Sequence, residues 1–246
     1  MKSVVLIPAR YKSTRFPGKP LALLLGKPMI LWVAELSAKA VGRENVYVAT
    51  EDARIYSLVE SAGFNAVMTS DQALTGTDRL AEAAEQIEAD IYINVQGDEP
   101  LVDPQDICNV RDEKRKHINA VVNGYSWISE SEDPQSVNIP KVISNESDYL
   151  VYMSRSPLPG FKEQKNAPLR YKKQVCIYAF TKEELLAFKN FGRKSQLECC
   201  EDIEILRFLE LGKPVKMIET RAGSLAVDVE EDILPVEAGL RRVHGL

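Results

Sequence analysis

Short apolar runs alternate with longer amphipathic stretches along residues 4–95. The runs at 4–7, 46–49, 67–68 and 91–95 consist almost entirely of apolar side chains, with few polar positions between them. A strand that is apolar at successive positions is typical of a sheet covered on both faces, and such sheets are mostly parallel. The alternation therefore predicts an α/β fold in which a mostly parallel sheet lies between two layers of helices.

Local signals predict where several helices begin. Thr77 is expected to cap a helix on which Leu80, Ala84 and Ile87 share one face. Thr181 and Glu184 have the spacing of a capping box, which predicts the start of a later helix. Further predicted elements are a helix over about 198–211, a strand over 215–218 and a terminal helix after Asp228.

The middle of the chain has a different character. Residues 126–170 are rich in polar residues, turn formers and prolines, and they interrupt the strand–helix alternation. A length of 246 residues fits one large domain. We therefore expect a single domain over 1–246, with 126–170 as an embedded arm or subdomain.

Composition excludes several classes of protein. The net charge of −5 leaves no basic excess with which to neutralise nucleic-acid phosphates. The four cysteines contain no C-x-x-C pair, and there are only two histidines, so a zinc centre, a disulfide framework or a histidine-based triad is not expected. No apolar run approaches the roughly 20 residues of a membrane span, and the first residues do not read as a signal peptide, so a cytoplasmic protein is expected.

The loop after the first predicted strand concentrates positive charge. Arg10, Lys12, Arg15 and Lys19 follow the strand closely, and Gly18 would let the backbone approach a ligand. Ligands of open α/β sheets bind at the carboxyl ends of strands, and a triphosphate needs several fixed cations. The alternative is a solvated polar loop. The pattern is neither a Walker A loop nor a G-x-G-x-x-G turn, which disfavours P-loop kinases and NAD enzymes.

Two acids stand at comparable positions. Asp98 follows the strand at 91–95, and Asp228 follows the apolar pair Ala226-Val227. Carboxylates at such places can hold Mg²⁺, which prefers oxygen ligands. Alternatively, Asp98 stabilises a turn before Pro100 and Asp228 is a helix N-cap. If both acids meet the cationic loop, the site would suit metal-assisted nucleotidyl transfer.

Several segments together resemble the CMP-Kdo synthetases, enzymes that activate 3-deoxy-manno-octulosonate (Kdo), an acidic sugar of bacterial lipopolysaccharide. The resemblance covers nearly the whole chain, strongly to Pro100 and more loosely after it. The matching segments are the opening through Lys19, Gly26-Lys27-Pro28-Met29, Thr75-Gly76-Thr77-Asp78-Arg79, Asn94-Val95-Gln96-Gly97-Asp98-Glu99-Pro100, Lys141-Val142, Tyr152-Met153-Ser154-Arg155, Ile177-Tyr178 and Glu201 through Arg207.

The resemblance implies a nucleotide-diphospho-sugar transferase (Rossmann-like) fold with a dimerisation arm, and a homodimer. It implies transfer of a cytidylyl group from CTP to a Kdo-type acid, with Mg²⁺ and release of pyrophosphate, for lipopolysaccharide biosynthesis. The implied catalytic residues are Arg15, Lys19, Asp98 and Asp228, of which Asp98 and Asp228 would bind the metal. The implied nucleotide-binding residues are Pro8, Ala9, Arg10, Arg15, Lys19, Thr75, Gly76, Thr77, Arg79 and Gln96. The implied acceptor-binding residues are Gln96, Arg155, Gln174, Tyr178, Glu201 and Ile205.

The chain departs from the family pattern at the acceptor end. Gln174 stands where the family typically has His, Ile205 replaces a Gln, and Val229-Glu230 replaces Thr-Pro after Asp228. The altered positions predict either a modified acid, such as 8-amino-3,8-dideoxy-manno-octulosonate or another acid, or a drifted pocket that still uses Kdo. A third alternative is a nucleotide-binding relative without catalysis, but Lys19, Asp98 and Asp228 are all retained.

Overall fold

The computed structural model describes residues 1–13, 15–130, 132–221 and 225–245. Thr14 of the cationic loop and Ser131 of the predicted arm lie outside the described residues. The strands of the main sheet are β1 (Ser3–Ala9), β4 (Val46–Thr50), β5 (Asn65–Met68), β6 (Ile91–Val95), β7 (Val121–Trp127), β8 (Lys141–Ser144), β9 (Leu150–Ser154), β10 (Lys172–Phe180) and β11 (Val215–Glu219).

Helices cover the sheet, and a small hairpin lies beside it. The helices are α1 (Met29–Val41), α2 (Ala53–Ser61), α3 (Gly76–Gln86), α4 (Pro104–Lys116), α5 (Lys182–Asn190), α6 (Gln196–Glu201), α7 (Leu206–Glu210) and α8 (Ile233–His244). The hairpin joins β2 (Leu23–Leu24) to β3 (Lys27–Pro28). Short 3₁₀ turns are η1 (Lys19–Leu21), η2 (Arg43–Asn45), η3 (Gln164–Asn166) and η4 (Glu230–Asp232).

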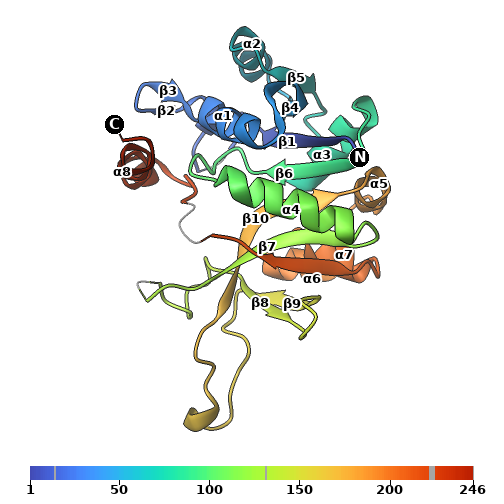
Figure 1. Cartoon of the computed structure of the whole chain (residues 1–246), viewed down its shortest axis with the longest axis vertical. Coiled ribbons are helices and arrows are strands. Elements are labelled where there is room, and N and C mark those ends of the chain that lie inside the picture. Colours follow the sequence, from blue (N-terminus) through green and yellow to red (C-terminus); the bar gives the residue numbers. More distant parts are fainter. Residues whose placement is uncertain (14, 131, 222–224, 246) are drawn as a thin grey trace.

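The predicted α/β class is confirmed. The sheet has the order β11-β7-β10-β6-β1-β4-β5, and every neighbouring pair is parallel except the two that involve β10. Val4 and Leu6 of β1 pack under α3, whereas Val5 and Ile7 pack under α1 on the other face. The strand is apolar at successive positions because both of its faces are buried between helices (Figure 1).

The segment 126–170 only partly leaves the sheet. β8 pairs antiparallel with β10, and β9 pairs with β8, so the sheet continues into this region. The chain between β9 and β10 then extends away from the body of the molecule (Figure 1). The expected interruption of the alternation is thus two added antiparallel strands followed by a long excursion.

Two predicted helix boundaries were wrong. Thr75, not Thr77, caps α3, because its side chain accepts a hydrogen bond from the backbone of Asp78. The single helix expected over 198–211 is broken into α6 and α7 at Asp202, whose backbone is left-handed with φ 51°. A left-handed residue ends an α-helix, and its amphipathic pattern alone does not reveal the break.

Candidate nucleotide-transfer site

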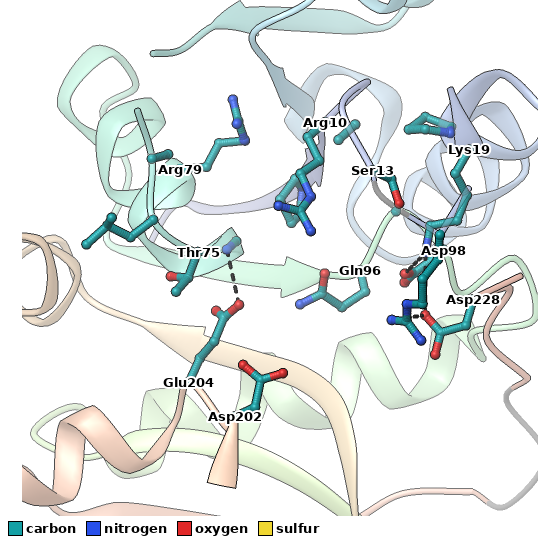
Figure 2. Close-up of a pocket in the computed structure, with 18 of the residues that line it drawn as sticks. Arg10, Ser13, Lys19, Thr75, Arg79, Gln96, Asp98, Asp202, Glu204 and Asp228 are labelled. Carbon is teal, nitrogen blue, oxygen red and sulfur yellow. Dashed lines mark hydrogen bonds and ion pairs between the residues drawn. The ribbon is translucent and has the colours of Figure 1, made fainter. Parts of the chain in front are cut away.

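A pocket of about 360 Å³ opens at the carboxyl ends of β1 and β6, beside the start of α3 (Figure 2). Open α/β sheets bind ligands at this edge. The sequence-predicted residues that line it are Pro8, Ala9, Arg10, Arg15, Lys19, Thr75, Gly76, Arg79, Gln96, Asp98 and Asp228. Lining residues that the sequence reasoning did not assign are Ser13, Pro20, Met29, Ala73, Leu74, Gly97, Lys194, Glu198, Asp202 and Glu204.

Close backbone packing forms the floor of the pocket. A Cβ atom added at Gly97 would lie 2.8 Å from the carbonyl oxygen of Pro8, so only glycine lets the ends of β1 and β6 approach this closely. Gly18 closes the cationic loop with a left-handed φ of 71°, and its N–H donates to the Tyr11 carbonyl at 2.9 Å. Both glycines hold loop residues at the rim of the pocket.

Two carboxylates and two cations meet at one end of the pocket. Lys19 Nζ lies 2.5 Å from Asp98 Oδ2 and 3.7 Å from Asp228 Oδ1, and Arg15 Nη2 lies 3.2 Å from Asp228 Oδ1. The backbone N–H of Val227 donates to the Asp98 carbonyl at 2.9 Å, which ties the two acid segments together. Residues separated by more than a hundred positions along the chain therefore share one charged centre (Figure 2).

Asp228 is not a helix cap, so that alternative is wrong. The N-cap of α8 is Asp232, whose carboxylate accepts from the backbone N–H groups of Asp228 and Val229. The Asp228 carboxylate faces Arg15 and Lys19 instead. The local sequence pattern could not distinguish these roles because Asp228 and Asp232 both precede the helix.

Arg79 lies deeper in the cationic side of the pocket. Its side chain forms an ion pair with Glu51 at 3.2 Å and donates to the hydroxyl of Thr69. Burial lowers the pKa of Arg79, although Glu51 opposes that effect. Arg10 is exposed and provides a further positive charge on the same side.

A carboxylate from the second half of the chain caps the start of α3. Glu204 accepts hydrogen bonds from the backbone N–H groups of Gly76 and Thr77 at 3.1 and 2.9 Å, and from the Thr77 hydroxyl at 2.6 Å. Helix N-termini favour negative charge because their first N–H groups have no partner within the helix. Thr77 is thus buried behind the pocket wall and does not line the pocket. No local signal near Thr77 could have identified Glu204.

A buried arginine joins the two walls. Arg207 is fully buried and donates to Asp78 at 2.9 and 3.3 Å and to Glu198 at 2.6 Å from each of two nitrogens. Burial opposes its charge, but these hydrogen bonds raise the pKa of Arg207. Because Asp78 belongs to α3 and Glu198 to α6, the arginine fixes the positions of two sides of the pocket relative to each other.

The predicted acceptor residues other than Gln96 lie outside the lining of the pocket. The Arg155 guanidinium donates to the carbonyls of Val137, Glu201 and Asp202. Burial opposes ionisation of Glu201, but hydrogen bonds from the Arg155 backbone and the Ser154 hydroxyl lower the Glu201 pKa.

The other predicted acceptor residues are Gln174 and Tyr178, which belong to β10, and Ile205, which lies in the hydrophobic core. Gln174 donates to the Tyr178 hydroxyl at 3.2 Å and to Asn123 at 3.3 Å. Burial raises the pKa of Tyr178 well above its usual value. Ile205 is only 1% exposed and belongs to the hydrophobic core. In this structure the Gln-to-Ile departure therefore changes core packing and not the pocket surface.

Positive charge on one side of a strand-end pocket, with paired carboxylates at its end, suits the binding of a nucleoside triphosphate with a divalent cation. A family model described as cytidylyltransferase matches residues 4–218. A 3-deoxy-manno-octulosonate cytidylyltransferase of Geotalea uraniireducens (strain Rf4) is 40% identical, over 98% of this chain and 100% of that protein. An 8-amino-3,8-dideoxy-manno-octulosonate cytidylyltransferase of Shewanella oneidensis (strain MR-1) is 39% identical, over 98% of this chain and 99% of that protein.

A solved structure agrees with these relatives. A CMP:2-keto-3-deoxy-manno-octonic acid synthetase complexed with CTP superposes with a TM-score of 0.91 at 36% identity, covering 99% of this chain and 100% of that one. The chain belongs to the cytidylyltransferase family and is a nucleotidyltransferase. The resemblance found in the sequence motifs is thereby confirmed. Among the described residues, no helix has the length and apolar character needed to cross a membrane.

Proposed function

We propose that this enzyme transfers the cytidylyl group of CTP to a Kdo-type sugar acid, releasing pyrophosphate, as a step of lipopolysaccharide biosynthesis in the cytoplasm. The observation that carries the proposal is the convergence of Lys19, Asp98 and Asp228 at one end of a pocket that is also lined by Arg10 and Arg79. The printed names of the similar proteins supply the substrate class.

The two carboxylates suit Mg²⁺. Asp98 and Asp228 approach the same ammonium group, so their oxygens face a common point that a cation can occupy. The described residues contain no cluster of three or more metal-ligating side chains. Mg²⁺ is commonly held by one or two carboxylates, with substrate phosphates and water completing its coordination. When bound, the ion would neutralise phosphate charge and polarise the transferred phosphoryl group.

The residues of the chain bind and orient the reactants. In the proposed reaction, a hydroxyl oxygen at the anomeric carbon of the acid forms a bond to the α-phosphorus, the bond from this phosphorus to the bridging oxygen of the departing pyrophosphate breaks, and the hydroxyl proton is released to solvent. Lys19 and Arg15 lie where they can offset negative charge that builds on the transferred and departing phosphates. Binding of both reactants at this edge would remove part of the entropic barrier to their reaction.

We expect CTP to be preferred over the other three common ribonucleoside triphosphates. The backbone at Ala9 and Arg10 offers fixed hydrogen-bonding groups that can match one base and leave others unsatisfied, and the turn at Thr75–Thr77, which Glu204 holds rigid, shapes the pocket beside it. Pyrophosphate release measured with each nucleotide and a panel of sugar acids tests this. Comparable rates with UTP or ATP would contradict the cytidylyl assignment.

We also propose that the working enzyme is a homodimer and that the excursion between β9 and β10 contributes to the contact. Phe161 and Leu169 in this segment are 45% and 101% exposed, and Val151 on β9 is 57% exposed. Apolar side chains on an extended arm are stabilised when a second copy covers them. Sedimentation equilibrium should show a dimer that Leu169→Asp with Phe161→Asp weakens, while Leu234→Asp on α8 leaves it unchanged. A monomeric wild-type protein at assay concentrations would refute this.

A further inference from the structure

The wall of the pocket formed by α6 and the following turn is acidic. Glu198, Asp202 and Glu204 all line the pocket, although both proposed reactants carry negative charge. Figure 2 shows Asp202 and Glu204 on the side opposite Arg10 and Lys19. Because like charges repel, an acidic wall disfavours an anionic ligand unless its carboxylates are neutralised by the protein or meet a cationic group on the ligand.

Two of the three carboxylates are satisfied by the protein. Glu198 is 1% exposed and accepts hydrogen bonds from two nitrogens of Arg207. It also accepts a hydrogen bond from the Ser195 backbone N–H at 2.9 Å. Glu204 accepts three hydrogen bonds at the start of α3. Neither carboxylate has substantial capacity left for a ligand cation.

Asp202 is different because its carboxylate faces solvent in the pocket. Its side chain is 76% exposed and forms an ion pair at 3.1 Å with Lys194, whose side chain is 38% exposed. Exposed pairs of this kind are weak and readily exchanged. A ligand cation can therefore take the place of Lys194 without leaving a buried charge unpaired.

The backbone that carries Asp202 is held firmly. Arg155 Nε donates to the Glu201 carbonyl at 2.5 Å, and Arg155 Nη2 donates to the Asp202 carbonyl at 3.0 Å. The left-handed conformation of Asp202 ends α6 and turns the chain toward the pocket. The result is a solvent-facing carboxylate on a fixed backbone, which is the arrangement expected for a specificity residue.

We infer that Asp202 selects an acceptor acid that carries a primary ammonium group, and that Arg155 positions Asp202 for this purpose. The inference rests on the proposed cytidylyl transfer and names the subclass of acceptor. 8-Amino-3,8-dideoxy-manno-octulosonate, the acid in the name of the Shewanella oneidensis relative, has the required chemistry. Its ammonium would replace Lys194 beside Asp202, while its carboxylate would remain available to the cationic side of the pocket.

The test compares kcat/KM for the 8-amino acid and for Kdo in the wild type and in Asp202→Asn. We expect the wild-type kcat/KM for the 8-amino sugar acid to exceed that for Kdo by at least tenfold, about 1.4 kcal/mol in specificity. Asp202→Asn should remove most of that preference by raising KM for the 8-amino sugar acid. It should change kcat/KM for Kdo by less than about twofold. Asn tolerates left-handed backbone, so the turn after α6 should persist.

Lys194→Met gives an independent measurement that does not alter the turn. Removing the competing Lys194 ammonium should raise kcat/KM for the 8-amino sugar acid by about threefold, because the free energy of an exposed ion pair is of that size. Glu146→Gln, at an exposed position between β8 and β9, is the matched control and should leave both acids unaffected. Circular dichroism of each variant checks folding.

Different results would contradict the role of Asp202 and the proposed cytidylyl transfer. The role of Asp202 would be overturned if the wild type used Kdo as well as or better than the 8-amino sugar acid. It would also be overturned if the preference survived Asp202→Asn. In both cases cytidylyl transfer would stand. A wild type that transfers from CTP to neither acid would overturn the proposed function itself. Loss of preference in Asp202→Asn, with a gain in Lys194→Met, supports the inference.

Discussion

Asp98→Asn should lower turnover with CTP and a sugar acid by two to three orders of magnitude or so, because it removes one of two carboxylates available to the metal. The same change frees Lys19 from its closest anionic partner. Steady-state pyrophosphate release with saturating Mg²⁺ measures the effect, and EDTA should abolish the activity of the wild type.

The change is nearly isosteric, so the variant should fold as the wild type does. Asp112→Asn on the outer surface of α4, away from the pocket, serves as a control and should keep full activity. A rate for Asp98→Asn within twofold of the wild type would show that this carboxylate does not hold the metal. Isothermal titration of Mg²⁺ in the presence of CTP gives a readout that does not depend on turnover.

Arg207→Met should destabilise the protein by about 3–5 kcal/mol, because it leaves the Asp78 and Glu198 carboxylates buried without their cation. For a chain of this size, such a loss lowers the melting temperature by roughly 6–20 °C. Differential scanning calorimetry and urea unfolding measure it. Catalytic efficiency should also fall, since the two pocket walls lose their link.

Arg111→Met provides the contrast for this prediction. Arg111 pairs with its neighbour Asp112 on the partly exposed side of α4. Loss of such a pair should change the free energy of unfolding by less than about 1 kcal/mol. If Arg207→Met proved as mild as Arg111→Met, the buried network would not be holding the walls together.

Several structural features could be predicted from local sequence. The apolar run of β1 and the capping box of Thr181 and Glu184 lie where expected. The crowding of Arg10, Arg15 and Lys19 after β1 correctly indicated the edge of the sheet at which the pocket lies. Each of these signals is contained within a few neighbouring residues, so the sequence expresses it directly.

The second wall of the pocket could not be predicted in this way. Glu204 and Asp202 reach the pocket because a left-handed residue breaks a helix that the periodicity predicts as continuous. Arg155, which is predicted to bind the acceptor, donates to the backbone carbonyls of that break. These contacts join distant parts of the chain, since Arg155 lies 46 positions from Glu201 and Glu204 lies 127 positions from Thr77.

The sequence by itself determined the layered α/β class and the strand-end position of the cationic loop, because these follow from periodicity and charge. The type of chemistry came from the resemblance of its motifs to the CMP-Kdo synthetases. Only the tertiary structure decided which carboxylates are neutralised by the protein and which face the ligand. That distinction depends on burial and on partners supplied by distant segments. Glu198 and Asp202 cannot be told apart from their neighbouring residues in the sequence. They differ in the fold because Arg207 neutralises Glu198, whereas Asp202 stays exposed beside Lys194.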